Sequence, residues 1–206
     1  MVETQTFMKS ASAATFTLLA FFIGLTPGHA QTLSAWQPLD AGERWTNFWD
    51  TTLADPNFYS AALLSAGYSQ ITKDPPEWQQ GAAGLGRRTA SWLAVYGIRE
   101  IIHQGGAAIL DYHPRYLSCG CSGFFPRTGH AIKWTFLTKN TSGQTRLDLP
   151  VIAGTYGANM LSTYWYPARY QALSDGVRSG NQQMALSIGL NFLREFEPDL
   201  KRMFKH

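Results

Sequence analysis

Glycine placed inside helical patterns is the feature that most constrains the fold of this chain. Segment 73–110, "KDPPEWQQGAAGLGRRTASWLAVYGIREIIHQGGAAIL", has apolar residues at helical spacing and also contains six glycines. Each glycine inside a helix costs roughly 1 kcal/mol relative to alanine. Such glycines persist where another backbone approaches closely. We therefore expect tightly packed helices, with this segment forming one long helix or two shorter ones that break near Gly84–Gly86.

Helix start signals occur along the rest of the chain. Asp40 is followed three residues later by a glutamate, which predicts a capping box. Pro56 ends that helix and opens the next one, because proline is tolerated in a first turn. Asp74 and Ser174 are the expected N-caps of two later helices. Segments 148–167 and 174–204 also carry helical apolar stripes, so the chain alternates between helices and short turns.

The expected fold is mainly α: a compact, glycine- and aromatic-rich bundle of about five to six helices. The chain has 206 residues, and the part that follows an N-terminal leader, residues 31–206, is expected to form a single domain. One alternative stays open for 130–149. Ile132, Trp134 and Phe136 alternate with polar residues, and the following "NTSGQ" suits a turn, so a β-hairpin competes with a helix that starts near Phe125. We favour the helix.

Residues 1–30 have the pattern of a secretory signal peptide. Lys9 precedes the apolar run "AATFTLLAFFIGL", Pro27 follows it, and Ala30 offers a cleavage point between small residues. The run is shorter than the roughly 20 residues of a membrane span. An uncleaved anchor is the alternative, and Met8 is a second candidate start. Residues 31–206 are therefore expected to be exported, to the periplasm or to a place associated with the outer membrane.

The charge pattern argues against nucleic acid as a partner. The chain has 17 lysines and arginines against 14 acids, a net charge of +3, and cleavage after Ala30 leaves that charge unchanged. No basic run reads as a nucleic-acid stripe, and we expect the pairs Arg87-Arg88 and Lys201-Arg202 to be solvated. A membrane span is also not expected after residue 30, because the most apolar window, 92–110, contains three ionisable residues. The glycine and aromatic content still suits a membrane surface or an envelope protein as partner.

Both cysteines lie in the densest polar stretch, "DYHPRYLSCGCSGFFPRTGHA" at 111–131. An oxidising compartment favours a disulfide between Cys119 and Cys121, and a small strained ring would make it easier to reduce. Thiol-redox chemistry is therefore one hypothesis. His113 and His130 lie near in sequence, but the spacing matches no zinc pattern. We expect no metal and no cofactor.

The same stretch also suggests a hydrolase. His130, with Arg115 and Arg127 on an anionic group, would act in a phosphatase-like periplasmic enzyme. "RTGHA" is similar to the Pro-Ser-Gly-His element of membrane-linked acid phosphatases, but the Arg, His and Asp set that follows in that family is missing. No Gly-x-Ser-x-Gly elbow is present either. The alternative, which we favour, is a structural polar cluster that pins helix ends: Asp111, Arg115, Tyr116, Arg127 and His130.

Several motifs together carry a family resemblance: "DPPEWQQG" at 74–81, "HPRY" at 113–116, "RTGHA" at 127–131 and "WYP" at 165–167. In this combination the chain resembles a family of exported bacterial proteins with no established activity. The resemblance implies export and a glycine-rich helical architecture, and it supplies no mechanism. The chain departs from that family at His113 and at the two cysteines. The sequence thus favours a non-enzymatic binding or structural protein of the cell envelope.

Overall fold

The computed structural model describes residues 31–33 and 37–203, and this part of the chain is mainly α-helical, as predicted. The predicted signal peptide lies outside the described residues. Helix α2 (Ala41–Phe48) continues directly into a π-helical turn at Trp49–Leu53. The helices are α2 (Ala41–Phe48), α3 (Pro56–Ile71), α4 (Gly81–Ile109), α5 (Phe124–Trp134), α6 (Leu149–Ser162) and α7 (Val177–Met203).

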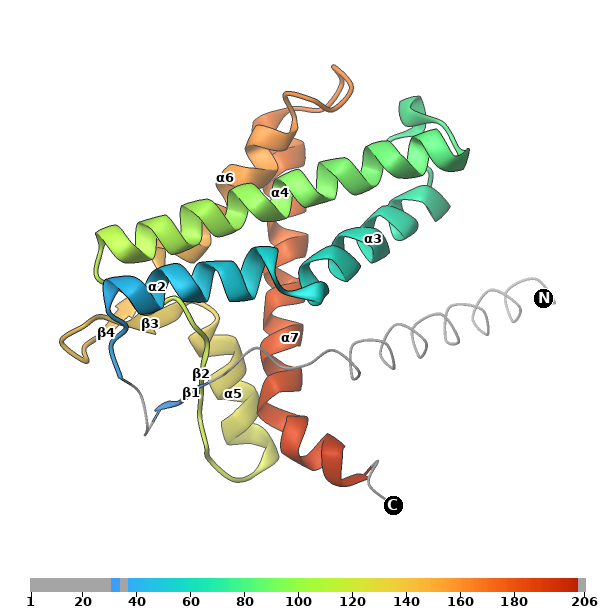
Figure 1. The fold of residues 1–206 in the computed structure, drawn as a ribbon. Coiled ribbons are helices and arrows are strands. Elements are labelled where there is room, and N and C mark those ends of the chain that lie inside the picture. Colours follow the sequence, from blue (N-terminus) through green and yellow to red (C-terminus); the bar gives the residue numbers. More distant parts are fainter. Residues whose placement is uncertain (1–30, 34–36, 204–206) are drawn as a thin grey trace.

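Helix α4 is the centre of the arrangement (Figure 1). It packs against α3, which runs antiparallel to it, and most extensively against α6. Helix α7 packs first against α6 and then, further along, against α5. The long α7 therefore connects the α3–α4–α6 layer to the smaller unit formed by α5 and the loop before it.

Two of the predicted helix starts are confirmed and two are wrong. Asp40 caps α2 in a full capping box, and α3 begins at Pro56. Asp74 does not cap α4, which starts after Gln80; its carboxylate accepts a hydrogen bond from the Tyr170 hydroxyl instead. Ser174 does not cap α7 either, since it lies inside a π-helical turn, Ala172–Gly176, that precedes the helix.

Segment 124–147 combines the two structures that the sequence left open. Helix α5 ends at Trp134, and a β-hairpin follows, with β3 (Leu137–Lys139) antiparallel to β4 (Thr145–Leu147). A glycine at position 143 has a φ of 78°, which the hairpin turn requires. A second small pairing joins β1 (Gln31–Thr32) to β2 (Leu117–Ser118) in parallel.

The glycines of α4 do not interrupt it, so of the two alternatives for this segment, one long helix is the one observed, without a break near Gly84–Gly86. Close backbone approach explains only some of them: a Cβ on Gly84 would clash with the carbonyl oxygens of Trp78 and Gln79. A Cβ on Gly154 of α6 would lie 2.7 Å from the carbonyl oxygen of Arg99, so this glycine is required at the α4–α6 contact. A Cβ on Gly97 or Gly105 would meet nothing within 4 Å. These two positions have room for a larger residue and no packing reason for glycine.

The described helices bury small and polar side chains and expose large apolar ones. In α3, Ala62 and Ala66 are fully buried against α4. Tyr59, Leu63 and Ile71 repeat at multiples of four residues on the outside, where they are 44%, 55% and 82% exposed. Most soluble helices have the reverse pattern. The buried polar residues include Asn47, Thr52, Arg88, His103, Thr155, Asn159, Gln183, Asn191 and Glu195.

Candidate functional site

One carboxylate, Glu195 on α7, organises the polar stretch 111–131. Its Oε1 accepts a hydrogen bond from the Tyr116 hydroxyl at 2.6 Å and another from the backbone N–H of Cys119 at 2.9 Å. The same oxygen lies 3.7 Å from Nε2 of His130 on α5. Glu195 is buried, with 5% of the residue exposed. It therefore joins α7, α5 and the intervening loop at a single point, and we call Tyr116, Cys119, His130 and Glu195 the Glu195 cluster.

His130 contacts a main-chain carbonyl, an aromatic ring and the Glu195 carboxylate within this part of the structure. Its Nε2 lies 2.8 Å from the carbonyl oxygen of Leu117, and its ring stacks on Trp134 with centroids 5.3 Å apart. Burial, together with the Glu195 carboxylate, raises the pKa of Tyr116, so its hydroxyl stays protonated and donates. A histidine whose ring nitrogen faces a main-chain carbonyl and a buried acid is arranged as a structural hydrogen-bonding group.

Arg127 closes the loop against the end of α7. Its Nε donates to the carbonyl of Cys121 at 2.8 Å, and its Nη1 forms an ion pair with Asp199. The guanidinium also lies 5.4 Å from the ring centroid of Phe196. Through these contacts the guanidinium joins the end of α7 to the loop that precedes α5.

Arg115 points to a different part of the molecule. Its Nε donates to Oδ1 of Asn47, whose Nδ2 donates to Gln104 on α4 at 3.0 Å. It lines a hollow of about 430 Å³ at the start of α2, beside Asp40 and Glu43. Arg115, Arg127 and His130 thus have separate partners on separate elements. The geometry offers no support for the predicted phosphatase-like hydrolase, in which the three would share one anionic group.

Asp111 also lies apart from the Glu195 cluster. It has a φ of 56° just after α4, and its carbonyl accepts the N–H of Thr141 from the hairpin turn. Of the predicted polar cluster, Tyr116 and His130 come together, whereas Asp111 and Arg115 have other partners. Sequence reasoning missed Glu195. A signal was present, because residue 195 falls at helical spacing from the buried Met184 and Asn191 on α7.

The two cysteines are paired with each other in this structure. Cys119 and Cys121 form a disulfide with their Cα atoms 5.1 Å apart, and the N–H of Cys121 also lies 3.3 Å from Sγ of Cys119. The thiol-redox hypothesis stays a prediction. Within residues 31–33 and 37–203, no three His, Cys, Asp or Glu residues are grouped as a metal ion would need.

The charged residues in the middle of α4 lie at its contact with α6. Arg99 Nη1 is 2.5 Å from Glu100 Oε1, and Arg99 Nε donates to Thr155 at 3.3 Å. Burial opposes the ionisation of Glu100, but Arg99 and His103 outweigh it and hold the pKa of that carboxyl at about 2. This network is an internal ion pair at a helix crossing.

His113 is buried in the turn between α4 and β2. Its backbone N–H donates to the carbonyl of Lys139 at 2.8 Å, and its backbone carbonyl accepts from the Thr138 hydroxyl at 2.7 Å. Burial lowers the pKa of the imidazole to about 4, and the nearby positive charges of Arg115 and Arg44 add to this, against a backbone hydrogen bond that opposes it. The neutral form is therefore the one that the fold accommodates.

This pKa predicts that stability falls on acidification. The unfolded imidazole binds a proton near pH 6.5, whereas the folded one does so only near 4, so the unfolded state holds more protons in between. We expect the contribution of His113 to be complete above about pH 6.5 and to fall by about 2 kcal/mol on going to about pH 5. Urea denaturation of the wild type and of His113→Gln across this range measures it. Parallel pH dependences in the two proteins would contradict the assignment.

None of the helices described here is long and apolar enough to cross a bilayer. The polar stretch that looked most reactive in the sequence is, in space, a set of hydrogen bonds and ion pairs between helix ends. Comparisons of the chain with protein-family models, with curated proteins and with solved structures give no match.

Proposed function

We propose that this chain is an exported, non-enzymatic protein of the cell envelope that works by docking its apolar exterior on a membrane surface. The observation that carries the proposal is the reversed distribution of side chains: small and polar inside, large and apolar outside. The signal-peptide pattern and the resemblance to exported bacterial proteins support the location. Large exposed apolar patches mark interaction surfaces in soluble proteins.

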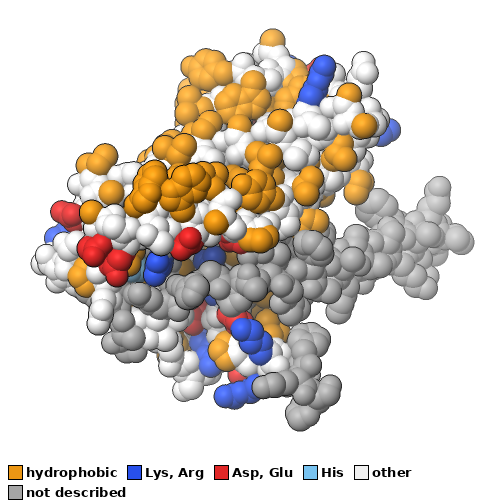
Figure 2. Space-filling model, in the orientation of Figure 1, with side chains coloured by type: hydrophobic (Ala, Val, Ile, Leu, Met, Phe, Trp, Pro, Cys, Tyr) orange, Lys and Arg blue, Asp and Glu red, His pale blue; other side chains and the backbone are white. Residues whose placement is uncertain are grey.

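Helix α3 is the clearest part of this exterior. It has sixteen residues and carries no charged side chain. It carries apolar residues on its exposed face as well as on its buried one, and an exposed apolar face of this kind is expected where a second apolar phase covers it. Figure 2 shows hydrophobic side chains gathered along the face where α2 and α4 lie, with a second group at the far end of α6. The outward side chains of α3 have the same character, so the docking surface extends over several elements.

The composition of the exterior favours lipid over a protein partner. Exposed tryptophan and tyrosine accompany the aliphatic residues, a mixture typical of the headgroup region of a membrane. Trp45 is 61% exposed, Tyr68 is 67% exposed and Tyr164 is 85% exposed. A protein lying on the bilayer needs such a face without any spanning helix.

Vesicle flotation tests this proposal. We expect the chain without residues 1–30 to float with vesicles of phosphatidylethanolamine and phosphatidylglycerol. The double variant Leu63→Gln and Ile71→Gln should partition onto vesicles at least about fivefold more weakly. Each replacement removes roughly 1 kcal/mol of favourable apolar contact with the membrane. Its thermal midpoint should stay unchanged, since both positions are exposed.

The matched control is the pair Leu147→Gln and Leu186→Gln, two exposed leucines on β4 and α7 rather than on α3. This control should float as the wild type does. A wild type that stays with the soluble fraction would contradict the membrane assignment. So would a wild type that self-associates in solution through α3, because the occupant of that face would then be a second copy.

A further inference from the structure

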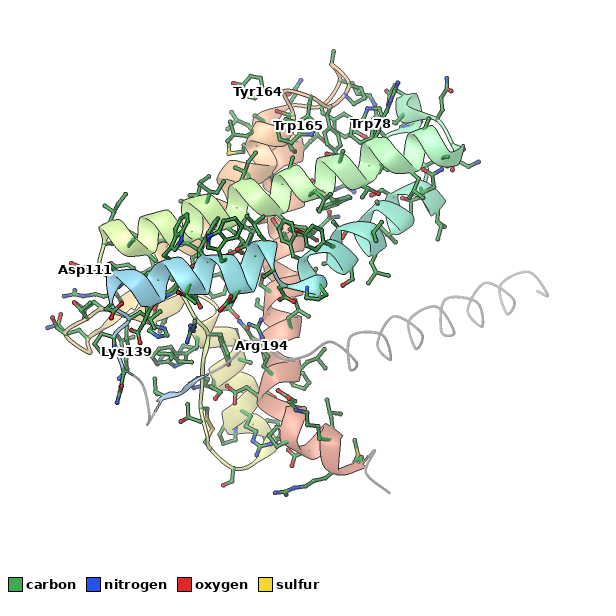
Figure 3. The ribbon with its side chains drawn as sticks, viewed as in Figure 1. Trp78, Asp111, Lys139, Tyr164, Trp165 and Arg194 are labelled. Atoms are coloured by element: carbon green, nitrogen blue, oxygen red, sulfur yellow. A yellow bond between two sulfur atoms is a disulfide. The ribbon has the colours of Figure 1, made fainter. Side chains whose placement is uncertain are left out.

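A groove runs along the first half of α4, at the end of the molecule where α6 terminates. Figure 3 places Trp78 and Trp165 together at this end, with Tyr164 beside them. The groove is open to solvent and has a volume of about 470 Å³. It is lined by Trp78, Arg87, Ala90, Ser91, Ala94 and Trp165.

The floor of the groove is one face of α4. Arg87, Ala90, Ser91 and Ala94 follow one another at the spacing i, i+3, i+4 and i+7, which places them in a single row. Seven residues of helix span roughly 10 Å. Ala90 and Ala94 are exposed, and their methyl groups are too small to fill the space above them. The floor is therefore a straight apolar strip with a cation at one end.

The walls are two indole rings that the surrounding structure fixes in place. Trp165 donates its Nε1–H to the Ser91 hydroxyl at 2.9 Å. Trp78 packs against the ring of Tyr166, with centroids 4.7 Å apart. The polar atoms of Trp165 and Ser91 thus satisfy each other. What the walls present to a ligand is mainly the apolar surface of the rings.

Arg87 is the cation of the groove, and its charge is uncompensated among the described side chains. The ion pairs that these residues form leave Arg87 out. Its two basic neighbours differ. Arg88 is buried and bonded to carbonyls, and Arg169 pairs with Glu77 at 2.7 Å. The charge that complements the groove is therefore a single negative charge at the Arg87 end.

We propose that this groove binds one acyl chain that ends in a carboxylate, with the chain between the two indole rings and the carboxylate on Arg87. A sugar would need several hydrogen-bonding partners, and the hydroxyl of Ser91 is already engaged. A straight chain needs only apolar contact and one charge. The assignment rests on the proposed docking function, because a lipid-bearing surface is where such chains are available.

Titration calorimetry with decanoate and, separately, with decanol tests the proposal on the full folded domain. The wild type should bind decanoate more tightly than decanol. Arg87→Gln should weaken decanoate binding roughly five- to tenfold, as expected for one charge-assisted pair, and leave decanol binding unchanged. Ala90→Leu combined with Ala94→Leu should abolish binding of both by filling the floor. Arg178→Gln and Ala185→Leu, at exposed positions on α7, are the matched controls and should bind as the wild type does.

Equal binding of decanoate and decanol by the wild type, or unchanged decanoate binding by Arg87→Gln, would overturn the inference. An Arg87→Gln variant that lost only vesicle binding would also overturn it, since the charge would then serve lipid headgroups rather than a bound chain. Decanoate is soluble as a monomer, so its binding does not depend on docking. If the wild type floats with vesicles but does not bind decanoate, the proposed function stands and this inference fails. If it binds decanoate but does not float, only the membrane docking is contradicted.

Discussion

We expect Glu195→Ala to lower the free energy of unfolding by about 3 to 5 kcal/mol, the range for breaking a buried charged contact by removing one partner. The carboxylate accepts the Tyr116 hydroxyl and the Cys119 N–H and lies beside His130. Alanine would leave these donors buried without their acceptor, and each such group costs roughly 1 to 3 kcal/mol. Urea denaturation followed by circular dichroism measures the difference.

The control for this prediction lies two residues away on the same helix. Glu197 forms an i, i+4 ion pair with Lys201, whose side chain is 65% exposed. Glu197→Ala should therefore cost no more than about 0.5 kcal/mol. Similar losses in the two variants would show that Glu195 makes no special contribution, and the Glu195 cluster would then not be the point that joins α5, α7 and the loop.

Arg88→Leu should destabilise the fold to a similar extent, lowering the free energy of unfolding by about 4 kcal/mol. Only 1% of Arg88 is exposed, and its guanidinium donates to the carbonyls of residues 74, 75 and 79 and to the Gln70 side chain. These bonds hold the turn between α3 and α4. Leucine keeps the apolar stem and removes every donor, so one buried and three part-buried acceptors lose their partner. The thermal midpoint should fall by roughly 10 °C for a chain of this size.

The adjacent residue supplies the comparison. Arg87 is exposed and belongs to none of the ion pairs among the described residues, so Arg87→Leu should change stability by less than about 0.5 kcal/mol. If the two neighbouring arginines proved equivalent, the buried hydrogen bonds of Arg88 would contribute nothing net to the fold. The sequence treats the two as one solvated pair, and the structure shows this to be wrong for Arg88.

Local signals carried much of the fold. The capping box at Asp40 and the proline at 56 act within one turn of a helix, so their outcome is readable from neighbouring residues. Asp74 and Ser174 have equally good local chemistry for a cap, yet tertiary contacts decide otherwise. At Asp74 the carboxylate instead accepts a hydrogen bond from the hydroxyl of Tyr170, 96 residues away. No window of local sequence contains that information.

The candidate site was predicted less well for the same reason. The concentration of reactive side chains at 111–131 suggested one cluster, but the partners of Arg115, Arg127 and His130 lie on α2 and α7, far away in sequence. The sequence could not show which of these partners each would meet. The groove between Trp78 and Trp165 was also not foreseen, because its walls are 87 residues apart and only the α4 floor is continuous.

The polar interior has a thermodynamic consequence. The heat capacity of unfolding rises with the apolar surface that becomes exposed and falls with the polar surface that becomes exposed. Here several leucines and isoleucines of α3 and α4, among them Leu63, Ile71, Ile101 and Ile109, are already exposed in the folded chain, while buried threonine, asparagine and glutamine side chains enter water on unfolding. The heat-capacity change of unfolding per residue should therefore lie below the usual value of roughly 12 to 15 cal/mol/K. A chain with such a change has a shallow stability curve, and its folded state responds weakly to moderate cooling or warming.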